Sequence, residues 1–337
     1  MICDIAIPVW NKKELTQRCV NSILSNTDHP YRIVLIDNGS RQPAAEYLKS
    51  VSESHPDKIR LIVNKENLGN TTAGVQAMKY SDADYVCILD NDTIVCKGWL
   101  SEMIRVAELS EKFGIINPNC NSFGVHRPAG MPLEDFGREL LHKNGGKFIE
   151  VGAAVGFCYL VKRKLINEIG CWDERFSPGY FEDTEYSMRA KKYGYKSVIA
   201  LGAYIFHDEH SSFKSKDKKK LFEKLFNESQ KKFHAMYGKP QRVLYILTKP
   251  VPDCKTLNNG IYRHADKGDF VSVFIKDGAC EPDRIIIHGN VKTCCLHGAW
   301  FGLRAISRII VKKKKFNKIY TDNKILAVML AAEVMHG

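Results

Sequence analysis

The stretch YVCILDNDT, residues 85–93, decides the fold of the first half of the chain. It begins as an apolar run of strand length and then passes abruptly into turn-forming residues, two of which are aspartates. Three similar apolar runs precede it, and amphipathic helices separate these runs. The strand-like runs are 4–10, 31–37, 59–64 and 85–90, and the predicted helices are 14–26, 71–80 and 98–109. This alternation predicts an α/β fold whose central sheet is mainly parallel and covered by helices on both faces.

The alternation of strand-like runs and predicted helices becomes irregular after about residue 120 and resumes around Gly238-Lys239-Pro240. Between these points we expect a helix within 177–195 and a very basic helix at 214–236. The four strand-like runs after the restart are RVLYILT (242–248), DFVSVFI (269–275), RIIIHG (284–289) and KIYTDN (318–323). We therefore predict two domains, 1–237 and 241–337. The second has too few strands for a complete doubly wound sheet, so we expect a fragment of a longer chain, with a small domain as the alternative.

Composition limits the class of protein. The chain has 337 residues, 44% of them hydrophobic and 26% charged, which excludes a disordered or collagen-like chain. The net charge of +12 favours anionic partners, namely nucleic acid, phosphorylated substrates or an acidic membrane surface. The 11 cysteines form no CxxC motif, and several interrupt apolar runs, which favours buried thiols in a reducing compartment. With neither a signal peptide nor an apolar run of about 20 residues, we expect a cytoplasmic protein, with the inner face of the membrane as a site of peripheral contact.

Asp90 and Asp92 give the sharpest functional signal, because they follow an apolar strand at spacing i, i+2. On an extended segment their side chains point the same way, and paired carboxylates suit Mg²⁺ or Mn²⁺ bound to a diphosphate. The alternative is an ordinary Asp-Asn-Asp turn. His207, in FHDEHSS after a later strand, becomes a candidate third metal ligand, and His210 is a weaker competitor.

A second acidic group lies in FEDTEYSMR, where Glu182, Asp183 and Glu185 occupy the first turns of a predicted helix. One interpretation is compensation of the helix dipole. The other is a general base held at a helix start beside a cleft. Two polar loops, IDNGS (36–40) and NKENLGNTTAGV (64–75), follow strands and suit contacts to a ribose or an anion. Neither a GxGxxG nor a P-loop signature accompanies them.

Taken in order along residues 1–235, these features resemble the family 2 glycosyltransferases, inverting enzymes with the GT-A nucleotide-sugar-binding fold. The matching blocks are AIPVWN, IDNGS, ENLGNTTAGV, LDNDT, GCWDERFSPGYFEDTEYSMR and the following His207. The resemblance implies a metal-dependent transfer of a sugar from a nucleotide-diphosphate donor to a hydroxyl of a growing glycan or lipid-linked saccharide. The blocks look most like polysaccharide and rhamnosyl-type transferases, so a hexosyl- or deoxyhexosyltransferase is expected.

The resemblance also assigns roles. It makes LDNDT the DxD motif, with Asp92 as principal metal ligand, Asp90 near the ribose or metal, and His207 as a further ligand to Mn²⁺ or Mg²⁺. It makes Asp183 the catalytic base, supported by Glu182. The residues implied to bind the nucleotide-sugar are Pro8, Asn11, Asp37, Asn67, Gly69, Asp90 and Asn91, and Trp172 and Asp173 are implied to lie on the acceptor side. Family members often carry a second acid where this chain has Asn38.

The second block, 241–337, weakly resembles the Rossmann-like N-terminal half of a GT-B glycosyltransferase, and we expect no independent activity there. The basic helix at 214–236 and the lysine run 312–315 suit either a solvated face or contact with anionic lipid. Three other functions stay open. A sugar-nucleotide nucleotidyltransferase would release pyrophosphate, and a non-catalytic nucleotide-sugar binder would show no turnover. A nucleic-acid-binding protein would bind with steep salt dependence, although the basic residues do not interleave with aromatics as in known motifs.

Overall fold

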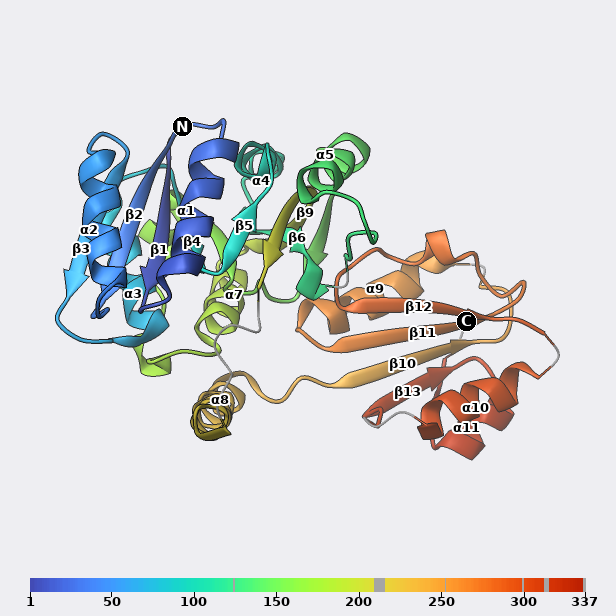
Figure 1. Cartoon of the computed structure of the whole chain (residues 1–337). Coiled ribbons are helices and arrows are strands. Elements are labelled where there is room, and N and C mark those ends of the chain that lie inside the picture. The colour runs from blue at the N-terminus through green and yellow to red at the C-terminus, as the bar shows by residue number, and fades with distance from the viewer. Residues whose placement is uncertain (124, 209–215, 252, 299, 312–314, 336–337) are drawn as a thin grey trace. The chain divides into compact units, whose positions relative to one another are not determined.

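The structure is a computed structural model that describes residues 1–337 except 124, 209–215, 252, 299, 312–314 and 336–337. It divides into two compact units (Figure 1). The first comprises Met1–Phe148 and Ala153–Tyr237, and the second comprises Ile149–Gly152 and Gly238–Gly337. His210, a candidate metal ligand, and Lys312–Lys314, part of the predicted lysine run, lie outside the described residues. Within the described part of the chain, no helix is both long and apolar enough to span a membrane.

The first unit is built on a mixed sheet whose strands follow the order β3-β2-β1-β4-β8-β6-β9-β5. The β1–β2, β2–β3, β1–β4 and β6–β9 pairs are parallel, whereas β8 and β5 run antiparallel to their neighbours. The strands are β1 (Cys3–Val9), β2 (Tyr31–Asn38), β3 (Ile59–Asn64), β4 (Tyr85–Leu89), β5 (Thr93–Val95), β6 (Phe113–Cys120), β8 (Cys158–Lys162) and β9 (Lys196–His207). Strand β7 (Phe148–Val151) falls in the second unit from Ile149 onward. Its helices are α1 (Lys13–Asn26), α2 (Ala44–Ser54), α3 (Gly69–Tyr80), α4 (Trp99–Ala107), α5 (Leu133–Asn144), α6 (Arg163–Ile169), α7 (Glu182–Lys192) and α8 (Lys216–Tyr237).

Both faces of this sheet are buried, which explains why its central strands are continuous apolar runs. All five residues of β4 are buried. On one face, residues of α1, α2 and α4 complete a core with alternate residues of β1. On the other face, residues of α3, α6 and α7 pack on the remaining positions of β1, β2 and β4. Two-sided burial of this kind is the usual reason for unbroken Val/Ile/Leu strands in parallel sheets.

The second unit has a parallel five-stranded sheet with the order β12-β11-β10-β13-β14. Residues of α9 share a core with one face of β10 and β11, while residues of α10 and α11 pack on the other face (Figure 1). The elements are β10 (Arg242–Leu247), α9 (Cys254–Asp266), β11 (Phe270–Lys276), β12 (Val291–Leu296), α10 (Phe301–Val311), β13 (Lys318–Thr321), α11 (Lys324–Leu330) and β14 (Glu333–Val334). Its likeness to half of a GT-B enzyme stays a prediction.

The fold class predicted from the sequence, α/β with a mainly parallel sheet, is confirmed, and a second partial α/β sheet is present. One strand was assigned wrongly. Residues 284–289 do not form a strand, and the strand that pairs with β11 is the following segment, β12. Both segments are short apolar runs, and only the pairing register with β11 separates them. All 11 cysteines are free thiols, and six of these are buried.

Candidate functional site

The candidate metal ligands come together where β4 ends and β5 begins. Asp90 follows β4, and its backbone N–H donates to the carbonyl of Phe157 at 2.8 Å. Asn91 and Asp92 form a turn, after which β5 pairs antiparallel with the end of β9, so that Thr93 lies opposite His207. The i, i+2 spacing predicted that the two aspartates lie on one extended segment, and this is wrong because Asn91 and Asp92 form a turn. In the structure a turn and a distant strand bring them to the imidazole instead.

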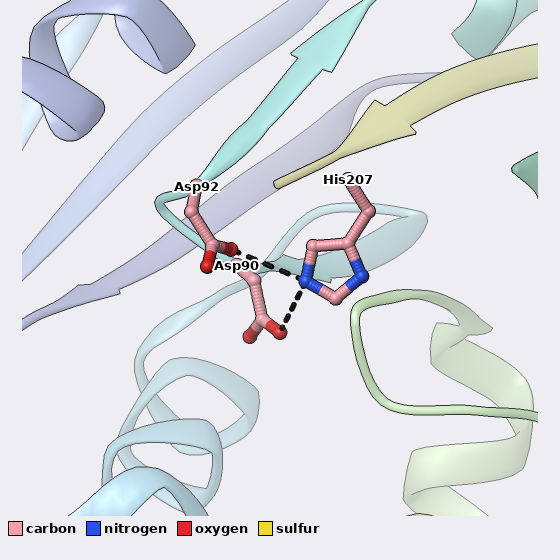
Figure 2. A group of neighbouring side chains, drawn as sticks. All are labelled: Asp90, Asp92 and His207. Atoms are coloured by element: carbon pink, nitrogen blue, oxygen red, sulfur yellow. Dashed lines mark ion pairs between the residues drawn. The ribbon is translucent and has the colours of Figure 1, made fainter. Parts of the chain in front are cut away.

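Asp90, Asp92 and His207 form a compact group of potential ligands (Figure 2). His207 Nε2 lies 3.2 Å from Asp92 Oδ1 and 3.7 Å from Asp90 Oδ2. One ligand atom from each residue falls within 4.8 Å of the others. Two carboxylate oxygens and one imidazole nitrogen are a donor set that suits Mn²⁺ or Mg²⁺. The residues present therefore fit a divalent cation.

Contacts around His207 fix the position of its ring. Its backbone N–H and C=O both bond to the side-chain amide of Asn121, each at 2.8 Å. The ring stacks on Phe157, with centroids 5.2 Å apart and an interplanar angle of 17°. These contacts orient the imidazole toward the two aspartates, as partners beyond the ligands commonly do around metal sites.

The electrostatics of this group favour a cation. Burial, followed by the charge of Asp92, raises the pKa of Asp90 to about 7, and the neighbouring His207 opposes the shift. Asp90 nevertheless keeps 32% of its side chain exposed, so its carboxylate remains accessible. A divalent cation beside two carboxylates removes their mutual repulsion and favours the ionised forms.

Asp183, the predicted base, lies at the start of α7 and is partly exposed. Its Oδ2 accepts from the backbone N–H of Gly156 at 2.7 Å. Its Oδ1 accepts from the N–H and the hydroxyl of Thr184 at 2.6 and 3.1 Å. Burial raises the pKa of Asp183, while these hydrogen bonds oppose the shift. The result is a fixed carboxylate that combines raised basicity with access to solvent.

Glu182 has a different environment from its neighbour. It is 5% exposed, and its Oε2 has no hydrogen-bond partner among the described residues. Burial, together with the charge of Asp183, raises the pKa of Glu182 to about 8. At neutral pH Glu182 is therefore mostly protonated, so it adds little negative charge beside Asp183.

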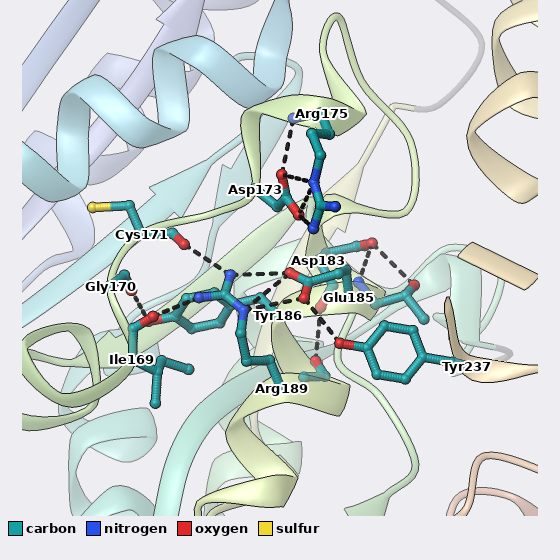
Figure 3. Close-up of polar contacts among 12 residues, drawn as sticks. Ile169, Gly170, Cys171, Asp173, Arg175, Asp183, Glu185, Tyr186, Arg189 and Tyr237 are labelled. Atoms are coloured by element: carbon teal, nitrogen blue, oxygen red, sulfur yellow. Dashed lines mark hydrogen bonds and ion pairs between the residues drawn. The ribbon is translucent and has the colours of Figure 1, made fainter. Parts of the chain in front are cut away.

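Glu185, the third acid of this group, has a structural role (Figure 3). It is 2% exposed, pairs with Arg189 at 3.0 Å and accepts from the hydroxyl of Tyr237 at 3.0 Å. Arg189 in turn donates to the carbonyls of Ile169 and Cys171 at 2.6 and 2.8 Å. This network fixes α7 against the loop before it and against α8. The acids at the start of α7 therefore have different roles. Asp183 is available for chemistry, whereas Glu185 stabilises the fold.

Sequence reasoning missed the way that α8 supports the start of α7. Tyr180 and Phe181 precede Glu182 with φ values of 75° and 70°, the left-handed region that non-glycine residues rarely adopt. Both rings pack on Phe226 of α8, with centroids 5.5 and 5.3 Å away. Ser229 of α8 also donates to the carbonyl of Gly179 at 3.1 Å. The sequence did contain one indication of this packing, because the basic helix carries apolar residues at helical spacing.

The predicted nucleotide-binding residues Pro8, Asn11 and Asp37 lie at or just after the carboxyl ends of β1 and β2, and β1 pairs with β4. Asp37 is 4% exposed and accepts from the N–H of Ser40 at 2.7 Å. Ser40 Oγ accepts from the N–H of Asn11 at 2.8 Å, and Asn11 Oδ1 accepts from the N–H of Arg41 at 2.9 Å. The loops that follow β1 and β2 therefore stabilise each other through these hydrogen bonds.

Asn38 organises the neighbouring loop, which carries Asn67 and Gly69. Its amide nitrogen donates to Asn67 Oδ1 at 3.0 Å and to the carbonyl of Gly69 at 3.1 Å. Gly69 has φ of +85°, and a Cβ there would lie 2.5 Å from the backbone of Pro178. An amide at position 38 both donates and accepts here, whereas an ionised acid would only accept. Asn91, between the two aspartates, donates to Thr16 Oγ1 at 2.9 Å.

Trp172 and Asp173, predicted on the acceptor side, are held within the protein. Trp172 is 3% exposed and packs in the core with Tyr159, so its ring does not lie on a surface. Asp173 binds Arg175 at 2.5 Å (Figure 3) and caps the short 3-10 helix Glu174–Phe176. A role for Asp173 toward an acceptor stays a prediction.

Gly156 and Phe157 link the two acidic groups, and the sequence analysis did not select them. Gly156 donates to Asp183, while Phe157 accepts from the backbone of Asp90 and stacks on His207. A Cβ at position 156 would lie 3.3 Å from Asp183 Oδ2, so the absence of a side chain allows this close approach. Glycines inside the apolar run 151–161 were the signal, because a glycine beside a strand often marks a close backbone contact.

Comparison with known proteins agrees with this geometry. The model of the family described as Glycosyl transferase family 2 matches residues 4–170. Glycosyltransferase AglE of Haloferax volcanii is 28% identical over 99 residues, which are 29% of this chain and 32% of that protein. The undecaprenyl-phosphate 4-deoxy-4-formamido-L-arabinose transferase of Pseudomonas savastanoi pv. phaseolicola is 25% identical over 151 residues, 40% of this chain and 44% of that protein. Each match covers less than half the length of the relative.

Solved structures share the fold. The crystal structure of GalNAc-T7 with UDP, GalNAc and Mn²⁺ has a TM-score of 0.51 at 15% identity, covering 69% of this chain and 50% of that chain. The family match spans β1 to α6 and includes Asp37, Asp90 and Asp92. On this basis residues 4–170 form a glycosyl transferase family 2 domain.

Proposed function

We propose that the first unit transfers a sugar from a nucleotide-diphosphate donor to a hydroxyl group, with inversion at the anomeric carbon and with the help of a divalent cation. The observation that carries this proposal is the segment Gly156–Phe157. Its backbone bonds to Asp183 on one side and to Asp90 on the other, and its aromatic ring stacks on His207. A fixed base and a metal-binding group are thereby held next to each other.

Each group in this site has a distinct task. Asp183 accepts the proton of the acceptor hydroxyl while that oxygen attacks the anomeric carbon from the face opposite the leaving group. Gly156 and Thr184 hold the carboxylate in place through hydrogen bonds. Asp90, Asp92 and His207 would hold the cation, which when bound would neutralise the charge that develops on the leaving diphosphate. The loops of Asn11, Asp37 and Asn67 would bind the base and ribose.

The substrate class follows from the same residues. Paired carboxylates with a cation select a diphosphate-linked donor, and GalNAc-T7, which shares the fold, was crystallised with UDP and Mn²⁺. The acceptor we propose is a hydroxyl of a growing glycan or a lipid-linked saccharide, as in polysaccharide biosynthesis. One matched relative is named an undecaprenyl-phosphate 4-deoxy-4-formamido-L-arabinose transferase, a name that includes a lipid phosphate. Mn²⁺ and Mg²⁺ both suit the ligands.

The test is release of nucleoside diphosphate from a panel of nucleotide sugars with Mn²⁺ and simple saccharide acceptors. Asp183→Asn should bind donor normally yet lower turnover by about 10²- to 10⁴-fold, the usual contribution of a general base. Asp82→Asn is the matched control, because Asp82 is 83% exposed and precedes the amino end of β4, away from the site. It should stay within about twofold of wild type, a difference of only ~0.4 kcal/mol.

Two results would overturn the proposal. Near-normal turnover by Asp183→Asn would remove the base from the mechanism. Release of inorganic pyrophosphate from a nucleoside triphosphate and a sugar 1-phosphate, with no release of nucleoside diphosphate from the nucleotide sugars, would identify a nucleotidyltransferase, which uses the same kind of cation site. Product analysis by NMR should show the anomeric configuration opposite to that of the donor.

A further inference from the structure

The second unit contains a recess that the proposed transfer reaction does not use. It has a volume of about 540 Å³ and lies where β12 ends and α10 begins. The residues that line it are Cys295, Leu296, His297, Leu303, Arg304, Ser307 and Arg308. Three of these side chains carry or can carry positive charge, one is a hydroxyl donor, and none is acidic. We propose that this recess binds a phosphate group of an anionic ligand.

The two arginines support this proposal because they lie on one face of α10 without an acidic partner. Arg304 Nη1 donates to the carbonyl of His297, and Arg308 Nη1 donates to Cys294 Sγ at 2.5 Å. Neither arginine forms an ion pair with any residue that the structure describes. Like charges at i, i+4 on a helix repel each other, so an anion between them removes an unfavourable interaction. Guanidinium groups also match phosphate geometry through paired hydrogen bonds.

His297 also lines the recess. Because the carboxylate of Asp277 accepts from its Nδ1, His297 donates from Nε2 only when its ring carries both protons. Its Nδ1 lies 2.5 Å from Asp277 Oδ1, and the backbone N–H of Gly298 donates to Asp277 Oδ2 at 3.0 Å. Asp277 thus orients the histidine ring but does not line the recess. His297 Nε2 has no partner among the described residues, which leaves it available to a ligand.

Position and charge point to the same class of ligand. Ligands of parallel α/β sheets bind outside the carboxyl ends of the strands, which is where this recess lies. Residues 238–337 contain 17 Lys and Arg against 8 Asp and Glu, so they carry +9 of the chain's net +12. A field of that sign concentrates phosphate-bearing molecules near the second unit.

The phosphate could belong to a soluble ester or to a lipid headgroup, because exposed apolar side chains lie beside the arginines. Leu303 lines the recess with 59% of its surface exposed, and Trp300, the residue before α10, is 66% exposed. The experiment therefore needs one probe for each source of phosphate.

The soluble arm measures binding of inorganic pyrophosphate to the full chain by calorimetry, with EDTA present so that the metal group of the first unit does not contribute. Arg304→Gln/Arg308→Gln should weaken binding by at least about tenfold, or 1.4 kcal/mol. Lys255→Gln/Lys267→Gln removes the same charge from exposed positions on or next to α9 and should change binding by less than about twofold. An Asp92→Ala background should leave this binding unchanged, which separates it from donor binding.

The lipid arm measures co-sedimentation with phosphatidylglycerol vesicles and with phosphatidylcholine vesicles at about 0.15 M salt, where weak surface attraction is screened. Retention on phosphatidylglycerol alone that is lost only in the arginine variant, without pyrophosphate binding, identifies a headgroup as the ligand. Pyrophosphate binding that is lost only in the arginine variant identifies a soluble phosphate. The proposal is overturned if neither probe binds, or if the arginine and lysine variants lose binding equally. Circular dichroism of each variant verifies that it is folded.

Discussion

The strand ends of the two units carry opposite charge although both units are parallel α/β folds. In the first unit Asp90, Asp92, Glu182 and Asp183 gather at the site, and burial raises the pKa of three of them. In the second unit His297, Arg304 and Arg308 line an open recess without an acid. A parallel sheet thus supplies a place for a ligand, while the residues after each strand decide whether that ligand is a cation or an anion.

The two sites also differ in how tightly their loops pack, and a pair of glycines tests this difference. Gly69 and Gly298 both have positive φ, but a Cβ on Gly69 would lie 2.5 Å from Pro178, whereas the nearest atom to one on Gly298 is an arginine nitrogen at 3.7 Å. Gly69→Ala should therefore destabilise the first unit by at least about 2 kcal/mol, and Gly298→Ala should cost the second unit about 1 kcal/mol. Hydrogen-exchange mass spectrometry resolves the two units, and equal losses would contradict the difference in packing.

The acidic site should make the stability of the first unit depend on pH. Glu182 has a pKa of about 8 in the folded chain against an ordinary value of 4.5, so the folded state holds its proton over that interval while the unfolded state releases it. Stability should therefore fall as pH rises from about 5 to about 8, by at least about 1 kcal/mol. Glu182→Gln should flatten this slope.

The measurement is urea unfolding with EDTA present, followed by tryptophan fluorescence in a Trp300→Phe background. The remaining tryptophans, Trp10, Trp99 and Trp172, all lie in the first unit. A slope that is identical in Glu182→Gln and in its parent would show that Glu182 does not titrate in this range. Glu111→Gln serves as control, since Glu111 is 91% exposed.

The smallest expected effect concerns the support of α7 by α8. Tyr237→Phe removes one hydrogen bond to the buried Glu185, which keeps its pairing with Arg189, so we expect a loss of about 1 kcal/mol. Tyr193→Phe, at a position that is 59% exposed, should leave the melting temperature unchanged. If both variants melt like wild type, α8 does not contribute to the position of the acids through this contact.

Much of the first unit could be predicted because its signals are local. The apolar runs of β1 to β4 and the aspartates that follow β4 are visible in short windows of sequence. The pairing of β5 with β9, which brings His207 to Asp92, joins residues more than 100 positions apart, so spacing alone could not show it. The same holds for Gly156, whose partner Asp183 lies on another element.

The strands of the second unit were harder to predict from the sequence for a related reason. RIIIHG at 284–289 and VKTCCL at 291–296 are both short apolar runs, and pairing with β11 selects the second. No sequence motif indicated the anion recess, because the spacing of His297, Arg304 and Arg308 is that of ordinary surface residues. Only the turn from β12 into α10 brings them around one volume.

The central claim is that Asp90, Asp92 and His207 hold a cation that in turn holds a nucleotide diphosphate. The most direct test is a thermal-shift panel of UDP-, GDP-, dTDP- and CMP-sugars with and without Mn²⁺, on wild type and Asp92→Ala. A ligand at 100 times its Kd stabilises the folded state by about 2.7 kcal/mol, which is readily seen as a rise in melting temperature. We predict a shift for one of the diphosphate classes, UDP-, GDP- or dTDP-sugars, that requires Mn²⁺ and is absent in Asp92→Ala, and no shift for CMP-sugars, which carry a single phosphate. An equal shift in the variant, or no shift with any donor, would contradict the claim.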